Sequence, residues 1–307
     1  MGALRSLRSV VVAAAVTVVL VGLAATPASA ATWISVGPVP GLSPRQPAAP
    51  AAPRAPMTWR VPIAMYHIVT PLAPDTTNPD LFVRSSEFEA QLKAAAAKGI
   101  RTITAHDLGA SIAANIAIPA KTMVLSFDDG RVESITYAWP IMQKYGSSLV
   151  FTGTNWIARD MNKDGRADTG YVGTFYVIVG RHDGNSLSFD QEATLARAGN
   201  EIANHTNSHI DVRIDHGAAL TAQVITAGHT IVTELAKRGV TTTVTTFAYP
   251  YGYTSTEAVN LLKAGGYTLA FTTVEGIAHH GQNQLLLPRV RVSRGQTAAK
   301  FLVSLGY

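Results

Sequence analysis

Short apolar runs and amphipathic segments alternate along the chain from about residue 59 to the C-terminus. The run Met123–Leu125 is apolar at every position, which is typical of a strand buried on both faces in a parallel sheet. Further apolar runs predict strands at residues 61–66, 100–104, 173–177, 244–249 and 267–271. Strands that alternate with helical patterns indicate parallel α/β units, but the pattern alone does not separate a barrel from an open sheet.

Helical patterns fill the intervals between these strands. The longest covers residues 218–238. Another covers residues 134–145, and Pro140 lies inside it, so we expect a kink or a late helix start there.

The first thirty residues have the pattern of a secretory signal peptide. Arg5 and Arg8 supply a basic start, an apolar run follows, and Ala28–Ala30 forms a small-residue cleavage site. The apolar run is short for a membrane anchor, so we expect cleavage before Ala31 and a secreted or cell-envelope protein without a stable membrane span. Residues 31–58 are rich in Pro and Ala and predict an extended linker, which leaves residues 59–307 as one domain.

The composition fits one large domain with a substantial core. Hydrophobic residues make up 47% of the sequence, and there is no cysteine, so disulfides are excluded. The formal charge is +5, and removal of the two leader arginines leaves +3. This charge is too small to indicate nucleic-acid binding, although it is compatible with an anionic cell envelope.

Two adjacent carboxylates, Asp128 and Asp129, come directly after the Met123–Leu125 run. The C-terminal end of a parallel strand is where barrels and open α/β sheets place their active sites. Neighbouring buried carboxylates repel each other unless a cation separates them. A metal on one and a proton-acceptor role for the other would resolve the repulsion.

His205 and His209 are four residues apart. On a helix or a helical turn this spacing places both rings on one side, within reach of one ion. Two His and one carboxylate leave open positions on a divalent metal, as in catalytic zinc sites. A zinc protease is disfavoured because no His-Glu-x-x-His occurs. Non-haem iron oxygenases use a similar ligand set, but the paired Asp has no place in that chemistry.

Three motifs together resemble the NodB-homology polysaccharide deacetylases, or carbohydrate esterase family four. They are Phe127–Gly130, the His205–His209 segment and Pro250-Tyr251. The segment Met65–His67 and the sequence Phe-Ala-Tyr-Pro-Tyr-Gly at 247–252 are similar to the branch that deacetylates poly-N-acetylglucosamine exopolysaccharides. The resemblance covers roughly residues 60–292 and implies an α/β fold with a distorted (β/α) barrel.

The resemblance also implies roles for the motif residues. Asp129, His205 and His209 would bind a divalent metal, with Zn²⁺ the expected ion, and Asp128 would act as general base. The backbone N–H of Tyr251 would stabilise the oxyanion. The reaction would be hydrolysis of an N-acetyl group on a glucosamine unit, with release of acetate.

Several roles stay open at this point. Many family members carry a Leu-x-His whose His protonates the leaving amine, and this chain lacks it. His280 is a candidate acid, with an ordinary loop residue as the alternative. Arg289 either orients Asp128 or forms a surface salt bridge. His67 either contacts the substrate or is a structural strand-end residue, and Tyr249 is a further candidate for substrate binding.

Two apolar runs compete for one strand position. The family expects a Thr-Phe-(Phe/Tyr)-Val strand, so we assign residues 173–177 to the barrel and treat residues 148–172 as an insertion. Four oxygen-bearing residues in the insertion match positions one, three, five and nine of a calcium loop, namely Asp160, Asn162, Asp164 and Asp168. Tyr171 replaces the bidentate Glu expected at position twelve, so the loop predicts weak Ca²⁺ binding, and a solvated polar turn is the alternative.

The prediction from the sequence is therefore a secreted, metal-dependent polysaccharide deacetylase that acts on an N-acetylglucosamine-containing polymer, from an exopolysaccharide or the cell envelope. A non-catalytic carbohydrate-binding protein on the same fold and an O-deacetylase of xylan are the alternatives. The complete Asp-Asp and His-His set favours the enzyme. The sequence leaves open which polymer is the substrate.

Overall fold

The computed structural model describes residues 57–72 and 78–307. All described residues belong to one compact unit that ends at Tyr307. The expected signal peptide and residues 31–56 of the expected linker lie outside the described residues. Within the described ranges, no helix combines the length and the apolar character needed to cross a membrane.

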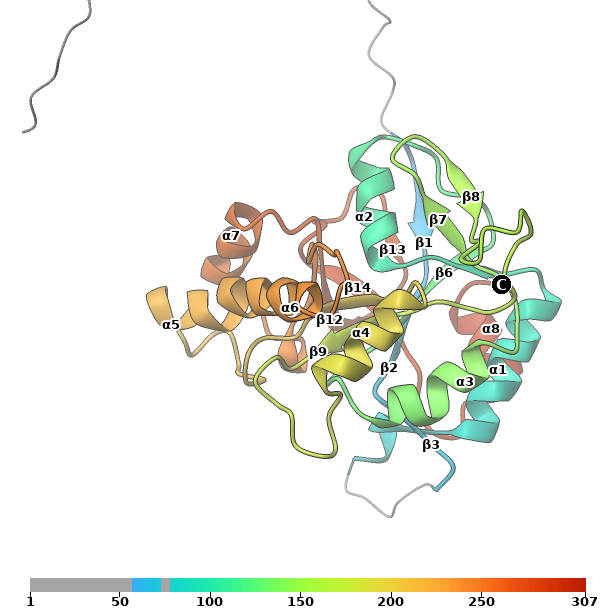
Figure 1. Ribbon diagram of the computed structural model, residues 1–307, viewed down its shortest axis with the longest axis horizontal. Helices are drawn as coiled ribbons and strands as arrows, with labels where there is room; N and C mark the ends of the chain where they lie inside the picture. The colour runs from blue at the N-terminus through green and yellow to red at the C-terminus, as the bar shows by residue number, and fades with distance from the viewer. Residues whose placement is uncertain (1–56, 73–77) are drawn as a thin grey trace, which may run out of the picture. The chain divides into compact units, whose positions relative to one another are not determined.

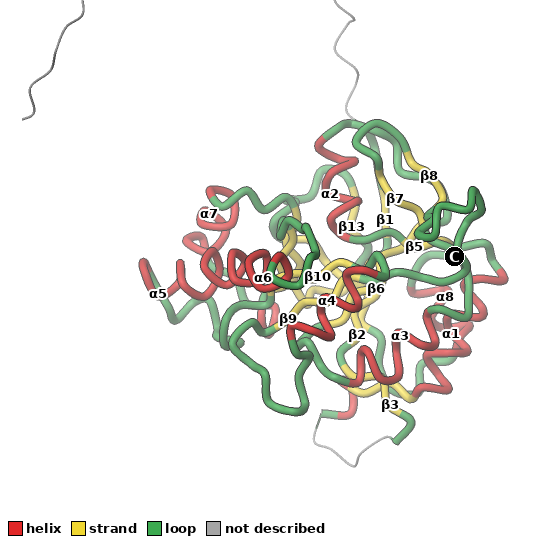
Figure 2. The backbone as a smooth tube through the Cα atoms, in the orientation of Figure 1, coloured by secondary structure: helices red, strands yellow, loops and turns green. Residues whose placement is uncertain are grey.

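A closed barrel of seven parallel strands forms the centre of the described chain (Figures 1 and 2). Around the barrel the strands run β2, β14, β12, β11, β10, β9 and β6, and β6 pairs with β2 to close the ring. Their bounds are β2 Ile63–Tyr66, β6 Thr122–Phe127, β9 Thr174–Val177, β10 Glu201–Asn204, β11 Thr246–Ala248, β12 Leu269–Glu275 and β14 Leu287–Arg291. The expected (β/α) barrel is confirmed.

The barrel is distorted between β6 and β9. These strands pair only where the C-terminal end of β6 meets the first half of β9, with Ser126 and Phe127 opposite Thr174 and Phe175. At its N-terminal end β6 pairs instead with the short strand β5 (Arg101–Thr102), which bridges on to Ser148. The inserted strand satisfies backbone groups that β9 does not reach.

Helices pack around the barrel on more than one side. In Figure 1, α5, α6 and α7 lie on one side, and α1, α3 and α8 gather on another. Their bounds are α1 Ser85–Ala97, α2 Ala105–Ala113, α3 Trp139–Met142, α4 Phe189–Arg197, α5 Gly217–Thr221, α6 Ala227–Ala236, α7 Thr256–Ala264 and α8 Ala298–Ser304. The helix α8, near the C-terminus, packs against α1, so the two ends of the domain meet.

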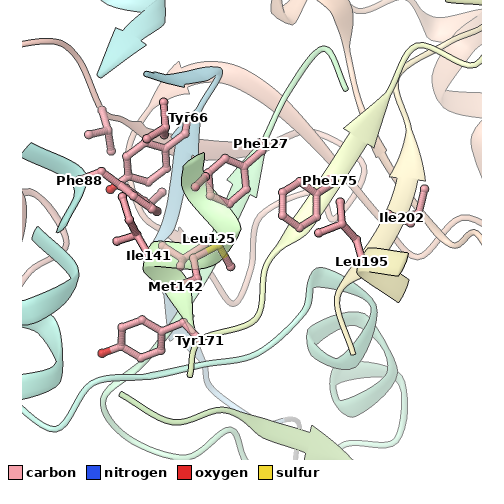
Figure 3. Packing of buried hydrophobic residues seen from close by; sticks show 14 of the residues in the cluster. Tyr66, Phe88, Leu125, Phe127, Ile141, Met142, Tyr171, Phe175, Leu195 and Ile202 are labelled. Carbon is pink, nitrogen blue, oxygen red and sulfur yellow. The ribbon is translucent and has the colours of Figure 1, made fainter. Parts of the chain in front are cut away.

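The main core lies between the barrel and the helices around it. Figure 3 shows the rings of Tyr66, Phe127 and Phe175, from three adjacent strands, in a row. Phe127 stacks on Phe175 at 4.8 Å between centroids and on Tyr66 at 5.5 Å, while Phe88 of α1 meets Tyr66 edge-on at 5.0 Å. All four rings are buried. The strand that carries the two Asp residues is therefore held by aromatic packing on both sides.

Two π-helical turns interrupt the expected helices. The segment η2 (Ser134–Ala138) runs into α3, with Pro140 in the first turn of α3. The ring of Pro140 cannot donate a backbone hydrogen bond, and the widened turn before it accommodates that loss. The α-helix thus begins late, at Trp139, which is one of the two outcomes expected from Pro140. The long helix expected at 218–238 is α5 and α6 joined by a second π turn, η3 (Ala222–Thr226).

The segment before β9 forms a hairpin outside the barrel. Strands β7 (Leu149–Phe151) and β8 (Trp156–Ala158) pair antiparallel and pack beside α2, while β9 takes the barrel position (Figure 1). Short strands also flank the two ends of the barrel. β1 (Arg60–Val61) pairs with β13 (Ala278–His279) next to the start of β2, and β3 (Ile68–Thr70) pairs with β4 (Phe82–Arg84) after its end. The 3₁₀ turn η1 (Pro79–Leu81) precedes β4.

Candidate active site

A pocket of about 240 Å³ opens at the C-terminal end of the barrel strands. Side chains that follow β2, β6, β10 and β11 meet there with residues of β12 and β14. The lining residues are His67, Leu81, Asp128, Asp129, His205, His209, Tyr249, Tyr251, Thr273 and Arg291. Larger hollows exist elsewhere on the described chain, so the chemistry of the lining, rather than its size, identifies this pocket.

Asp129, His205 and His209 converge in the pocket. Asp129 Oδ1 lies 3.4 Å from His205 Nε2 and 3.2 Å from His209 Nε2. His205 Nδ1 donates to the Ala248 carbonyl at 2.7 Å, which fixes the tautomer and leaves Nε2 free to bind an ion. Among the described residues this is the one group of three or more His, Cys, Asp or Glu residues arranged to hold a metal. The donor set fits a divalent ion with open coordination positions.

The two His residues do not lie on a helical turn, so that expectation is wrong. β10 ends at Asn204, and Thr206 and His209 have left-handed φ values of 67° and 59°. The Thr206 N–H donates to Asn204 Oδ1 at 2.8 Å, and the His209 N–H donates to Thr206 Oγ1 at 2.8 Å. These side-chain bonds replace helical ones and fold a loop that brings both rings to the same ion site.

The Asp-Asp turn is also a left-handed backbone segment. Asp129 has φ 70° and Gly130 has φ 57°. A Cβ on Gly130 would lie 3.1 Å from Val177 Cα, on the neighbouring strand β9. Because Asp129 pays a conformational cost in this region, its position indicates a functional constraint on the turn.

Asp128 forms a bidentate ion pair with Arg289 inside the barrel. Arg289 Nη1 and Nη2 donate to the two carboxylate oxygens, each at 2.7 Å, and neither residue is more than 2% exposed. Arg289 is therefore not part of a surface salt bridge. Burial alone would raise the pKa of Asp128, but the adjacent guanidinium outweighs it and holds the pKa below its usual value. Asp128 is thus an anion at neutral pH, with its orientation fixed.

The electrostatics of the metal-ligand group favour a cation. Burial tends to raise the pKa of Asp129, but hydrogen bonds from His205 and His209 hold it well below its usual range. Burial tends to lower the pKa of His205, and Asp129 more than reverses that effect. The carboxylate thus attracts positive charge, which protons on the imidazoles or a metal ion can supply.

His67 follows β2 and faces Asp128. Its Nε2 lies 3.9 Å from Asp128 Oδ2, and burial lowers the pKa of the ring despite the nearby carboxylates. The structure places His67 in the pocket wall, which is the position that the substrate-contact alternative requires.

Tyr251 and Tyr249 lie on the turn after β11. Tyr251 is the second residue of the 3₁₀ turn η4 (Pro250–Gly252), and its φ of 60° places it in the left-handed region. The first hydrogen bond of the turn is donated by Gly252 to the Tyr249 carbonyl, so the turn itself makes no use of the Tyr251 N–H. Tyr249 lines the pocket, but its hydroxyl donates to the Leu285 carbonyl and is not directed to a substrate.

The structure places His280, an expected site residue, outside the pocket. It follows β13, which pairs with β1 beside the start of β2, and its N–H donates to the Trp59 carbonyl. This position is at the N-terminal end of the barrel, opposite the pocket. His280 therefore cannot protonate a group bound there, and the prediction of an acid at this residue is wrong.

Sequence reasoning missed Arg291, Thr273 and Leu81 in the pocket lining. Arg291 lies two residues beyond Arg289 on β14, so the period-two rule of strands would have placed both on one face. No comparable local signal marks Thr273 or Leu81.

The expected calcium loop is an exposed turn of the insertion. Asp160 accepts hydrogen bonds from the backbone N–H groups of Asp164 and Gly165, at 3.1 and 2.8 Å. Asp168 accepts from the Met161 N–H at 2.6 Å. These bonds are compatible with the solvated-turn alternative, and Ca²⁺ binding stays a prediction.

The Polysacc_deac_1 family model, described as polysaccharide deacetylase, matches residues 116–270. The chain belongs to this family. The matched segment contains Asp128, Asp129, His205, His209 and Tyr251, whereas His67 and Arg289 lie outside it. The family match therefore covers the candidate metal-ligand group and both Asp residues, while His67 and Arg289 are placed beside them by the structure alone.

Similar proteins agree with this membership. The Bacillus subtilis (strain 168) protein YxkH, whose name is that of a polysaccharide deacetylase, is 25% identical over 244 residues, 79% of this chain and 75% of that protein. The poly-beta-1,6-N-acetyl-D-glucosamine N-deacetylase of Escherichia coli (strain K12) is 26% identical over 212 residues. That match covers 60% of this chain but only 30% of the E. coli enzyme.

Solved deacetylases share the fold. The Streptococcus pyogenes deacetylase PplD, in complex with acetate, superposes with a TM-score of 0.67 at 21% identity, over 81% of this chain and 99% of that one. At this identity the likeness supports the barrel architecture alone. The polysaccharide deacetylase described here thus has a family fold and a family motif set, while its substrate has to be argued from the site.

Proposed function

We propose that this polysaccharide deacetylase uses a divalent metal, with Zn²⁺ the expected ion, to hydrolyse N-acetyl groups on an N-acetylglucosamine-containing polymer. The observation that carries the proposal is the division of roles between adjacent residues. Asp129 faces the two imidazoles, while Asp128 is held by Arg289 within the same pocket. A binding protein would have no need for a second, oriented carboxylate beside the ligand set.

A cation held by Asp129, His205 and His209 supplies Lewis-acid chemistry, which polarises the amide carbonyl and acidifies water. Asp128 accepts the proton of the attacking water as general base. Arg289 keeps Asp128 ionised and fixes the direction of its oxygens. Asp128 is therefore placed to take a proton from a water in the same pocket as the residues that would hold the cation.

The remaining steps need an oxyanion donor and a proton for the leaving amine. Tyr251 lines the pocket, and its N–H, which the turn does not use, is suited to stabilise the negative oxygen of the tetrahedral intermediate. With His280 excluded, His67 is the uncommitted ring near Asp128. It is placed to take the proton that Asp128 receives and to pass it to the departing nitrogen.

The substrate class rests on two supports. The E. coli relative is named for poly-N-acetylglucosamine, and the residues around His67 and Tyr251 follow the pattern of that branch. An O-deacetylase of xylan is the second candidate, because the same chemistry hydrolyses an ester. The leader sequence supports action outside the cytoplasm, and N-terminal sequencing of exported protein should begin at Ala31.

The test compares metal content with acetate release in the wild type and three variants. Asp128→Asn should retain about one zinc per chain yet lose at least ~10²-fold in rate, the lower end for general base catalysis. His205→Ala and His209→Ala should lose both metal and activity, because the two ligands left hold zinc poorly. Chelation of the wild type should reproduce the His variants, and added zinc should restore activity.

The substrates should include poly-N-acetylglucosamine, chitin oligomers, peptidoglycan and acetylated xylan. Wild-type activity of Asp128→Asn would overturn the mechanism. If the wild type binds zinc and an N-acetylated polymer but releases no acetate from any of the four, the carbohydrate-binding alternative is correct. Acetate release from xylan alone would shift the assignment to the ester.

A further inference from the structure

Two exposed tyrosines extend outward from the pocket. The Tyr251 and Tyr253 side chains belong to residues that are 56% and 43% exposed. The Tyr251 ring centroid lies 4.6 Å from that of His209, and the Tyr253 centroid lies 5.9 Å from that of Tyr251. The rings thus form a continuous aromatic surface from an expected metal ligand to solvent. Exposed aromatic surface beside a polar pocket is characteristic of a binding site.

Arg213 completes this surface. Its guanidinium carbon lies 3.6 Å from the Tyr253 ring centroid, so it covers one face of the ring. Asp211 accepts from Arg213 Nε at 2.9 Å and from Nη2 at 2.6 Å, which fixes the guanidinium and neutralises its charge. Asp211 makes no use of Nη1, and the Arg213 side chain is 51% exposed. Donors therefore remain available on a nearly neutral surface.

Both segments that carry this surface are anchored. Ser255 Oγ donates to the Val212 carbonyl at 3.0 Å, and Val212 is fully buried. Thr273 Oγ1 donates to the Tyr251 carbonyl at 3.2 Å, and a Cβ on Gly252 would collide with Thr273. The backbone that carries the rings is therefore held in place before a ligand arrives, which lowers the entropic cost of binding.

We propose that Tyr251, Tyr253 and Arg213 form a saccharide subsite for the sugar unit next to the one being deacetylated. The inference rests on the proposed function, because the catalytic pocket defines which unit reacts. A pyranose ring offers apolar C–H faces to aromatic rings and hydroxyl or acetamido oxygens to the free N–H groups of Arg213. A neutral acetylated sugar suits a surface whose single cation is already paired. The subsite makes the reaction depend on chain length.

The test measures kcat/KM on β-1,6-linked N-acetylglucosamine dimers and hexamers. Tyr253→Ala should lower the hexamer-to-dimer ratio at least about fivefold, the effect of one aromatic stacking contact. Tyr253→Phe should keep most of the ratio, because it keeps the ring. Arg213→Gln should lower the ratio less than Tyr253→Ala. The matched control is Tyr307→Ala, since Tyr307 is a 37% exposed tyrosine that hydrogen-bonds Thr122 at the start of β6, away from the pocket.

Equal losses on dimer and hexamer, or no loss in Tyr253→Ala, would overturn the subsite. A second measurement separates this failure from that of the proposed function. Calorimetry of hexamer binding by Asp128→Asn, with and without Tyr253→Ala, needs no turnover. Tyr253-dependent binding without acetate release from wild-type protein would reject the deacetylase and keep the subsite, while binding that ignores Tyr253 would reject the subsite in either case.

Discussion

Two buried carboxylates inside the barrel, one at each end, have pKa values shifted in opposite directions. Asp128 follows β6 at the C-terminal end and accepts two hydrogen bonds from Arg289. Glu201 begins β10 at the N-terminal end, and its three hydrogen bonds come from neutral donors, the His106 N–H and the Thr174 and Thr246 hydroxyls. Burial raises the pKa of Glu201, whereas the pKa of Asp128 is lowered.

The difference shows what makes a buried carboxylate usable as a base. Both residues are at least nine-tenths buried, so burial does not distinguish them. Neutral donors at Glu201 do not overcome the desolvation of a charge, while the guanidinium at Asp128 does. Glu201 therefore ties α2 to the barrel with a raised pKa, whereas the pKa of Asp128, beside the candidate ion site, is lowered.

Removal of the Arg289 guanidinium should have the largest effect. Arg289→Met leaves Asp128 buried and unpaired, so we expect the unfolding free energy to fall by about 3–5 kcal/mol. The pKa of Asp128 should rise toward that of a desolvated acid, and the rate at pH 7 should fall at least ~10²-fold. Denaturant unfolding and acetate release check the two effects.

Two further variants keep this prediction testable if Arg289→Met does not fold. Arg289→Lys keeps the charge but not the bidentate hydrogen bonding. It should move the acid limb of the pH–rate profile to higher pH. The double variant Asp128→Asn/Arg289→Met should recover part of the lost stability without activity, because no unpaired charge is left. An active Arg289→Met protein would show that the ion pair is not needed for the base.

The same chemical change at the two ends of the barrel sharpens the comparison. Asp128→Asn and Glu201→Gln each convert a carboxylic group to an amide. We expect the first to abolish most activity and the second to change the rate by less than about threefold, with a stability change below about 1.5 kcal/mol at neutral pH. Acetate release and thermal unfolding of both variants, measured together, check this. A large loss of rate in Glu201→Gln would mean that the two ends are coupled.

The sequence predicted the C-terminal end of the barrel far better than the N-terminal end. Asp128, Asp129, His205 and His209 stand in short motifs after apolar runs, so local signals identify them. The hydrogen bonds between Arg289 and Asp128 join residues 161 positions apart. From the sequence, Arg289 could either orient Asp128 or form a surface salt bridge.

Other features had no local signal at all. Glu201 and its donors come from α2, β9, β10 and β11, and only the closed barrel brings them together. The position of His280 depends on the pairing of β1 with β13, two strands of two residues each, which are too short to predict from periodicity. The left-handed loop at Thr206 and His209 depends on side-chain hydrogen bonds that a helical spacing rule does not foresee.

A third buried carboxylate extends the comparison to the outside of the barrel, with the smallest expected effect on function. Glu192 of α4 is 1% exposed, and its Oε2 has no hydrogen-bond partner among the described residues. The nearby cation, Arg238, is hydrogen-bonded to Asp190 and Glu234 instead. Burial raises the pKa of Glu192 from 4.5 to about 8.

The raised pKa of Glu192 determines how the free energy of unfolding changes with pH. Because the folded-state pKa lies above the unfolded value, the stabilising contribution of Glu192 is present below about pH 4.5 and is lost as the pH rises toward 8. Gln cannot ionise, so Glu192→Gln avoids this loss of stability. It should match the wild type at pH 5 and exceed its unfolding free energy at pH 8, by no more than about 4 kcal/mol, with an unchanged deacetylation rate.

Denaturant unfolding at pH 5, 6.5 and 8 measures this difference. Glu89→Gln is the control, because Glu89 is more exposed and its hydrogen bond from Lys144 lowers its pKa. That variant should show no gain at pH 8. If Glu192→Gln also gains nothing between pH 5 and pH 8, Glu192 is ionised in the folded protein. Burial without a paired cation would then not be enough to keep a carboxylate neutral.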